Sequence, residues 1–184
     1  MSQLRLSVCI ATLNRASFIG ATLDSIIAQA SDEVEIVVVD GASSDNTGQV
    51  VREHQRRFPR LRYVRLDAKG GVDQDYCRAV ACAQAEFCWL MTDDDLLKPG
   101  ALAAVLAATR RNFGLIVVNA EVRNADLSRL LATRRVPFQS DRIYQPTEAD
   151  HHRLLAEAGD YLSFIGGVVI RRRLWEAREK ERYF

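Results

Sequence analysis

The chain has 184 residues, of which 48% are hydrophobic, and its 25 basic and 24 acidic residues leave a formal net charge of +1. This length suits one domain with a substantial core, and the balanced charge argues against a nucleic-acid partner. The sequence has no apolar run of about 18 residues and no secretory leader pattern, and its four cysteines show no C-x-x-C spacing, so we expect a cytoplasmic protein with free thiols.

Apolar and β-branched runs alternate with segments of helical periodicity through residue 120. Strands are expected in the stretches LRLSVCIAT, VEIVVVD, LRYVRL, EFCWLM and GLIVVNA. Helices are expected between them, the first over residues 19–27 and the last from Pro99 to about Arg110. This alternation predicts parallel βαβ units, and therefore an α/β fold with a mostly parallel sheet flanked by helices.

The remainder of the chain lacks this alternation of predicted strands and helices. Residues 121–160 mix charges, prolines and short apolar pieces, which predicts loops and short elements. After Gly166 and Gly167, the stretch VVIRR has the composition of a strand, and RRLWEAREKERYF has that of a helix. We therefore expect a single α/β domain with an irregular C-terminal part.

Polar residues follow the predicted parallel strands at their carboxyl ends. They are Thr12, Asn14 and Arg15 after the first strand, Asp40 at the end of the second, Asp73 after the third, and Asp93, Asp94 and Asp95 after the fourth. In open α/β sheets, ligands bind outside the carboxyl ends of the strands, where the strand order reverses. The sequence therefore predicts that these side chains meet in one cleft.

The chemistry of such a cleft suits a nucleoside diphosphate. Ionised carboxylates accept hydrogen bonds from a base or from ribose hydroxyls. Another carboxylate of the acidic run can hold Mg²⁺ or Mn²⁺, which take oxygen ligands and complete their shell with phosphate oxygens and water. A cation that bridges a diphosphate would act as a Lewis acid on the leaving group.

Each of these residues also has a purely structural explanation. Acidic residues before a helix interact favourably with its dipole, and Pro99 fits a first helical position. Asp40 before a glycine is a common turn, Arg15 an ordinary surface cation and Asp73 an N-cap. The phosphate-loop pattern G-x-x-x-x-G-K-[ST] and the dinucleotide fingerprint G-x-G-x-x-G are both absent, which argues against NTPases and dinucleotide-dependent dehydrogenases.

Four ordered motifs give the chain a family resemblance. They are LSVCIATLNRASFIGATLDSIIAQ, VEIVVVDGASSDNT, GGVDQDYCRAV and EFCWLMTDDDLLKPGAL, and they lie between residues 6 and 102. With these motifs the chain resembles family-2 glycosyltransferases of the GT-A fold, particularly the abequosyltransferase-like branch that builds bacterial surface polysaccharides. The resemblance implies a Rossmann-like sheet, with residues 1–120 as the nucleotide-sugar-binding half and residues 121–184 as the acceptor-side half of the same domain.

The same resemblance implies roles for individual residues. Asp40 matches the carboxylate that contacts the base, Asp73 matches a polar position that faces the nucleotide, and the segment with Thr12, Asn14 and Arg15 matches the first nucleotide contact. The family's Asp-x-Asp or Asp-Asp metal motif falls on residues 93–95, although Thr92 stands where many relatives have the first Asp. We expect Asp93 near the ribose, and Asp94 and then Asp95 as ligands of Mn²⁺ or Mg²⁺.

The general base departs from the family pattern. Many members place an Asp, often within a Glu-Asp pair, after the strand that here reads FIGGVVIRRRLW, and this chain contains no Glu-Asp pair. Asp160, Glu179 and Glu181 are the carboxylates available, and Asp160 and Glu181 are the preferred base candidates. Family members are usually longer, so a C-terminal truncation that removes part of the acceptor site is expected as an alternative.

The favoured hypothesis is an inverting, metal-dependent glycosyltransferase, which moves a sugar from a nucleoside diphosphate donor to a saccharide or lipid-linked saccharide acceptor. Four arginines offer contacts to phosphate or to an anionic membrane surface, or form a solvated basic face. They are Arg123, Arg129, Arg134 and Arg135. Two other classes stay open: a nucleotide-sugar-binding domain without turnover, and a phosphoacceptor receiver domain, whose acidic residues would follow the first and third strands.

Overall fold

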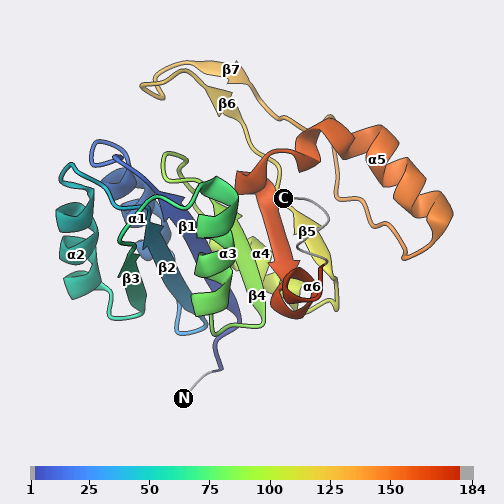
Figure 1. Ribbon diagram of the computed structural model, residues 1–184. Coiled ribbons are helices and arrows are strands. Elements are labelled where there is room, and N and C mark those ends of the chain that lie inside the picture. The colour runs from blue at the N-terminus through green and yellow to red at the C-terminus, as the bar shows by residue number, and fades with distance from the viewer. Residues whose placement is uncertain (1–2, 179–184) are drawn as a thin grey trace.

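The computed structural model describes residues 3–178, which form a six-stranded sheet with helices on both faces and a C-terminal extension (Figure 1). The strands of this sheet are β1 (Leu6–Thr12), β2 (Val34–Asp40), β3 (Leu61–Arg65), β4 (Phe87–Met91), β5 (Leu115–Val117) and β8 (Val168–Arg171), in the order β3-β2-β1-β4-β8-β5. The flanking helices are α1 (Ile19–Ile27), α2 (Thr47–Arg57), α3 (Val72–Cys82), α4 (Ala101–Thr109) and the short α6 (Arg172–Glu176). The predicted α/β class is confirmed. None of the helices in residues 3–178 is both long and apolar enough to cross a membrane.

The first four strands form the parallel part of the sheet, as their apolar sequences predict. β1 pairs with β2 and β4, and β2 pairs with β3, all in parallel. Every residue of β2 and β4 is buried, because helices cover both faces of the sheet. The register places Thr12 opposite Asp40, so the carboxyl ends of β1 and β2 are level with each other.

Side chains of β1 alternate between two hydrophobic cores, as the period of a strand requires. Val8 packs in one core with Leu23 of α1 and Leu102 of α4. Cys9 points to the opposite face and packs in the second core with Val80 of α3. Burial of one such apolar side chain contributes about 1.5–3 kcal/mol, and these contacts fix the helices against the sheet.

Beyond β4 the sheet differs from the expectation. β5 runs in the same direction as β4, as GLIVVNA predicts, but it covers only Leu115–Val117 and is separated from β4 by β8, which runs antiparallel to both neighbours. Trp89 Nε1 donates a hydrogen bond to the Gly166 carbonyl oxygen at 2.8 Å, and this bond holds the start of β8 near β4. The insertion depends on contacts between segments that are far apart in the chain, which local patterns do not encode.

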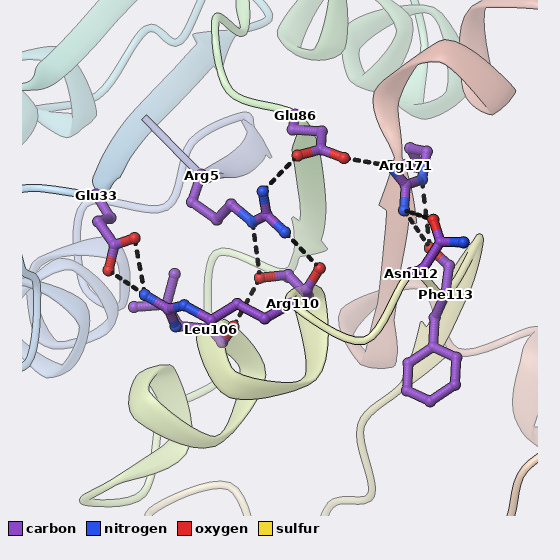
Figure 2. A network of polar contacts seen from close by, with 9 residues as sticks. Arg5, Glu33, Glu86, Leu106, Arg110, Asn112, Phe113 and Arg171 are labelled. Carbon is purple, nitrogen blue, oxygen red and sulfur yellow. Dashed lines mark hydrogen bonds and ion pairs between the residues drawn. The ribbon is translucent and has the colours of Figure 1, made fainter. Parts of the chain in front are cut away.

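A polar network closes the amino-terminal end of the sheet (Figure 2). Arg5 Nη1 donates to Glu86 Oε2 at 2.7 Å, and Arg171 forms an ion pair with Oε1 of the same carboxylate. Arg5 Nη2 also donates to the Thr109 carbonyl oxygen at 2.8 Å, and Arg171 Nη2 donates to that of Phe113 at 3.2 Å. The network joins the starts of β1 and β4 to the end of β8 and to the chain after α4.

The C-terminal extension is more regular than expected. The strands β6 (Val122–Arg123) and β7 (Leu130–Ala132) form a hairpin that projects beyond the carboxyl edge of the sheet, and α5 (Glu148–Leu162) extends away from the sheet (Figure 1). The prediction of only loops and short elements over residues 121–160 is wrong for α5, which has 15 residues. Its start is stabilised by the Thr147 hydroxyl, which accepts the Asp150 N–H at 3.2 Å.

A 3₁₀ turn, η1 (Ile165–Gly167), then leads into β8. The predicted terminal helix ends at Glu176 within the described residues.

Candidate functional site

The loops after β1 and β2 are tied together at the carboxyl edge of the sheet. Asn14 Oδ1 accepts the Ser44 N–H at 2.8 Å, and the Arg15 N–H donates to Thr47 Oγ1 at 2.8 Å. Asn14 adopts a φ of 55°, a left-handed conformation that Asn tolerates better than most residues. The Asn14 side chain therefore shapes the loop that presents Arg15 at this edge.

The acidic run after β4 has a positive partner within the chain. Arg15 Nε lies 3.5 Å from Asp93 Oδ1, and Arg15 Nη2 lies 3.7 Å from Asp94 Oδ2. Burial raises the pKa of the Asp93 carboxyl, while Arg15 and the Thr12 hydroxyl oppose this rise, although Thr12 Oγ1 forms no well-directed hydrogen bond. The Asp94 side chain is 44% exposed and can meet a ligand directly.

Asp95 lies beside the turn η1 that leads into β8, whereas the ion pairs of Arg15 are with Asp93 and Asp94. Asp95 Oδ2 accepts the Thr92 hydroxyl at 2.5 Å, and a Cβ added to Gly166 would lie 3.1 Å from the same oxygen. The segment that leads into β8 therefore packs against the acidic run, which follows from the antiparallel position of β8 beside β4.

The helix after the acidic run starts later than expected. α4 begins at Ala101, so the prediction that Pro99 occupies the first helical position is wrong. Gly100, with a φ of 84°, provides the turn into the helix, and residues 96–100 separate Asp95 from it. Because the effect of a helix dipole fades beyond the terminal turn, the dipole does not account for the three carboxylates.

Asp40 is fully buried at the end of β2, and each of its carboxylate oxygens accepts a hydrogen bond. Oδ1 accepts the Ser43 N–H at 2.7 Å, and Oδ2 accepts the Tyr63 hydroxyl at 2.5 Å. Burial and the bond to Asp40 raise the pKa of Tyr63 to about 12. Each oxygen of Asp40 therefore accepts one hydrogen bond from the protein and retains capacity for a second.

The two aspartates at the start of α3 have opposite environments. Asp73 is exposed, whereas Asp75, which the sequence analysis missed, is only 5% exposed. A Cβ added to Gly41 would lie 3.0 Å from Asp75 Oδ2, so this carboxyl reaches the end of β2. Helical spacing could have revealed it, because Asp75 shares a face with Ala79, four residues on, which is fully buried.

Of the general-base candidates, only Asp160 lies within the described residues. Asp160 is exposed on α5, and Ser163 Oγ donates to its backbone carbonyl at 2.7 Å. Glu179 and Glu181 lie outside the residues that the structure describes.

The four arginines of the extension differ in their contacts. Arg123 Nε lies 2.6 Å from Glu121 Oε1, and Arg134 Nη1 donates to the Phe138 carbonyl oxygen at 2.9 Å. The Arg135 guanidinium lies over the Phe164 ring, 4.9 Å from its centroid. Arg129, beside β7 in the projecting hairpin, has an exposed side chain.

The donor set fits a hard cation that arrives with a diphosphate. Within residues 3–178, no group of three or more His, Cys, Asp or Glu side chains forms a ready metal site. Asp94 and Asp95 nevertheless supply carboxylate oxygens at the carboxyl edge, and Mg²⁺ or Mn²⁺ can be held by one or two carboxylates when phosphate oxygens and waters complete the shell.

A mostly parallel sheet with a row of polar loops at its carboxyl edge is the architecture of the GT-A class. The fold of the fragment 1-349 of the S. aureus protein TarS matches it with a TM-score of 0.76 at 22% identity, over 94% of this chain and 48% of the fragment. The family model described as "Glycosyl transferase family 2" matches residues 7–173. The chain therefore belongs to glycosyl transferase family 2, which confirms the resemblance and removes the receiver-domain alternative.

Two further comparisons add detail. Abequosyltransferase RfbV of Salmonella typhimurium is 24% identical over 181 residues, which are 94% of this chain and 54% of that protein. The mannosyltransferase PcManGT of Pyrobaculum calidifontis, solved with GDP-Man and Mn²⁺, has a TM-score of 0.56 at 27% identity, over 67% of this chain and 37% of its own. TarS has also been solved with UDP-GlcNAc. The chain thus spans about half the length of RfbV and 29% of the longer TarS chain that has been solved.

Proposed function

We propose that this chain carries the donor site of an inverting, metal-dependent glycosyltransferase that takes a sugar from a nucleoside diphosphate. The main support is the contact of Arg15 with Asp93 and Asp94, which places one cation and two carboxylates from separate loops at the carboxyl edge. The nearly buried Asp93 is suited to ribose hydroxyls, and the exposed Asp94 is suited to a cation.

Asp94, with Asp95 as the second carboxylate, would hold Mn²⁺ or Mg²⁺ beside the diphosphate. When bound, the cation stabilises the negative charge that develops on the leaving diphosphate. Arg15 can contribute to the same end, because a guanidinium donates to phosphate oxygens as well as to carboxylates. Thr12 Oγ1, which acts on the Asp93 carboxyl without a well-directed hydrogen bond, is a further group that a bound nucleotide could engage.

We assign the acceptor side to the C-terminal extension, for a saccharide or lipid-linked saccharide. Asp160 and Glu181 are the proposed general bases, of which one would remove the proton of the acceptor hydroxyl. The projecting hairpin, with the exposed Leu130, Leu131 and Arg129, is the part proposed to contact an anionic membrane surface. The role of Asp160 as base is tested with Asp160→Asn, which we expect to bind the donor as the wild type does but to lose sugar transfer.

Thermal unfolding of the purified chain against UDP, GDP, CDP and dTDP, each with and without Mn²⁺, tests the donor site. At a hundredfold excess over Kd, a ligand of the native state stabilises by about 2.7 kcal/mol. We expect one diphosphate to stabilise the chain in a Mn²⁺-dependent manner, and Asp94→Ala to lose that dependence. Asp32→Ala, which removes an exposed carboxylate paired with Arg60 before β2, is the matched control. A Mn²⁺ dependence that survives in Asp94→Ala contradicts the metal assignment.

A nucleotide-sugar-binding domain without turnover is the second candidate. It is favoured by the exposure of Asp160, for which the structure gives, within residues 3–178, no side-chain hydrogen bond or ion pair that would hold it in position as a base. Hydrolysis or transfer of the sugar from the diphosphate that binds most tightly distinguishes the two, because a pure binding domain retains the donor unchanged.

A further inference from the structure

The backbone of Arg135 is fixed at the base of the β6–β7 hairpin. Its N–H donates to the Ala120 carbonyl oxygen at 2.9 Å and to Asn119 Oδ1 at 3.1 Å. The next residue, Val136, donates its N–H to the same Asn119 oxygen at 3.0 Å and is buried in a cluster with Tyr161 of α5. The chain that returns from the hairpin is therefore tied to the chain that follows β5, and this fixes where the Arg135 side chain starts.

The Arg135 guanidinium lies over two aromatic rings. It is 4.9 Å from the ring centroid of Phe164, which precedes η1, and 5.8 Å from that of Tyr161, near the end of α5. A planar guanidinium stacks on ring faces, which leaves the N–H donors at its edges available to an anion. The rings also restrict the side chain before a ligand arrives, so less conformational freedom is lost on binding.

The charge of Arg135 is not balanced by a carboxylate in the described part of the chain. Two other arginines of the extension also lie over rings, and each of them has an acidic partner. Arg142 Nη1 lies 3.0 Å from Glu157 Oε2, and Arg153 Nη2 lies 3.3 Å from Asp150 Oδ1. Arg135 is exposed and forms no ion pair with any of residues 3–178. Its guanidinium is therefore available to an anion that comes from outside.

The rings connect Arg135 to the acidic run. A Cβ added to Gly166 would lie 2.8 Å from Phe164 Cζ and 3.1 Å from Asp95 Oδ2, so the edge of the ring and the carboxylate flank the same glycine. Burial raises the pKa of Tyr161 to about 12, and Arg135 opposes this rise while Asp95 adds to it, so both charges act on one hydroxyl. Arg135 therefore lies across η1 from the carboxylates of the proposed donor site.

We propose, on the basis of the proposed function, that Arg135 recognises an anionic group of the acceptor, which is therefore a saccharide that carries a phosphate or a carboxylate. The guanidinium would donate two parallel N–H bonds to two oxygens of that group, a geometry that both anions offer. With the anion at Arg135, the saccharide extends past Phe164 towards the acidic run, where the donor sugar is proposed to lie. A neutral saccharide offers no such pair of charged oxygens and binds less tightly.

The experiment keeps the donor cleft filled, so that the anion cannot bind there. The full chain is saturated with Mg²⁺ and with the nucleoside diphosphate that stabilises it most, and NMR titration measures Kd for glucose 6-phosphate, glucuronate and glucose. We expect one of the two anionic sugars to bind at least tenfold more tightly than glucose, and its identity distinguishes phosphate from carboxylate. For Arg135→Gln we expect this affinity to fall about tenfold or more, as for loss of hydrogen bonds to a charged group. The affinities for glucose and for the nucleoside diphosphate should not change.

Arg111→Gln is the matched control. Arg111 also lies over a ring, 5.0 Å from the Phe113 centroid, but before β5 at the opposite end of the sheet. Its loss should leave all four affinities unchanged.

The contrary outcomes fall into two groups. Equal affinity of the wild type for the three sugars, or a preference for the anionic sugar that survives in Arg135→Gln, overturns the proposal and leaves the donor site in place. Loss of binding to phosphatidylglycerol vesicles in Arg135→Gln, with sugar affinities unchanged, also overturns it and assigns this cation to a membrane surface. Failure of every nucleoside diphosphate to bind the wild-type chain overturns the donor site itself, and the role of Arg135 with it.

Discussion

Arg15 Nε lies 3.5 Å from Asp93 Oδ1, so a cation from the loop after β1 occupies the place where a metal-bound diphosphate is proposed to lie. The Arg15 side chain is 43% exposed, and exposed ion pairs contribute about 0–1 kcal/mol. We predict that Arg15→Met frees the carboxylates and tightens Mn²⁺ binding in the absence of nucleotide by up to about fivefold. Electron paramagnetic resonance of free Mn²⁺ measures the change.

Arg57→Met is the matched control for this prediction. Arg57 Nη2 pairs with Asp24 Oδ1 at 3.0 Å on the surface of α1 and α2, and its side chain is 61% exposed. Its loss should leave Mn²⁺ affinity unchanged. Weaker Mn²⁺ binding by Arg15→Met would mean that Arg15 supports the cation site and does not compete with it.

The bond from Tyr63 to Asp40 gives a prediction about stability. Tyr63→Phe removes the hydroxyl that Asp40 Oδ2 accepts at 2.5 Å and leaves a fully buried carboxylate oxygen without a donor. We expect the free energy of unfolding to fall by about 1–3 kcal/mol, measured by urea denaturation. Tyr144→Phe, whose hydroxyl donates at 2.5 Å to Glu157 on the surface of α5, should cost less than about 1 kcal/mol. Equal losses in the two variants would show that burial of Asp40 does not set the cost.

Much of the fold follows from the sequence because its signals are local. The continuous apolar runs of β1, β2 and β4 predict buried parallel strands, and such strands place Asp40 and Asp93 at one edge. The insertion of β8 beside β4 could not be predicted in this way, because the two strands lie about 80 residues apart and pair through tertiary contacts.

The site was predictable in outline but not in its contacts. The sequence places carboxylates at the edge, yet the partners of Asp40 depend on Tyr63 from the next strand and on the loop at Ser43. Asp73 and Asp75 are the same residue type, and only their positions around the helix determine that Asp75 is buried and Asp73 is exposed. The pairing of Arg15 with Asp93 depends on a loop conformation that Asn14 stabilises.

Asp75 should make stability depend on pH with a definite sign. Its pKa in the folded protein lies above the ordinary value of 3.8, so between 3.8 and the folded pKa the native state binds more protons than the unfolded state. The free energy of unfolding therefore falls as pH rises through this window. We predict that Asp75→Asn removes this fall, so its stability relative to wild type increases from pH 4 to pH 7.

Urea denaturation at a series of pH values checks this prediction. Asp73→Asn, at an exposed position on the same helix, should change stability by no more than about 0.5 kcal/mol. A constant difference between Asp75→Asn and wild type over this range would show that the Asp75 carboxyl is stabilised in the folded protein by a group that compensates its burial.

Glu35 provides a test of stability away from the donor site, at the amino-terminal end of β2. Its Oε1 accepts the Ser7 hydroxyl and the Gln84 N–H, both at 2.6 Å, and the residue is 5% exposed. These bonds join β1 and β2 to the turn before β4. Glu35→Ala leaves the buried Ser7 hydroxyl and the partly buried Gln84 N–H without this acceptor and opens a cavity, so we predict a loss of about 2–4 kcal/mol in the free energy of unfolding. Glu33→Ala, which removes a partly exposed partner of Arg110, should cost under about 1 kcal/mol.

Because Glu35 lies at the end of the sheet opposite to the acidic run, the nucleoside diphosphate affinity of folded Glu35→Ala should match that of the wild type. A loss of affinity without a loss of stability would mean that the network at the amino end controls the loops at the carboxyl edge.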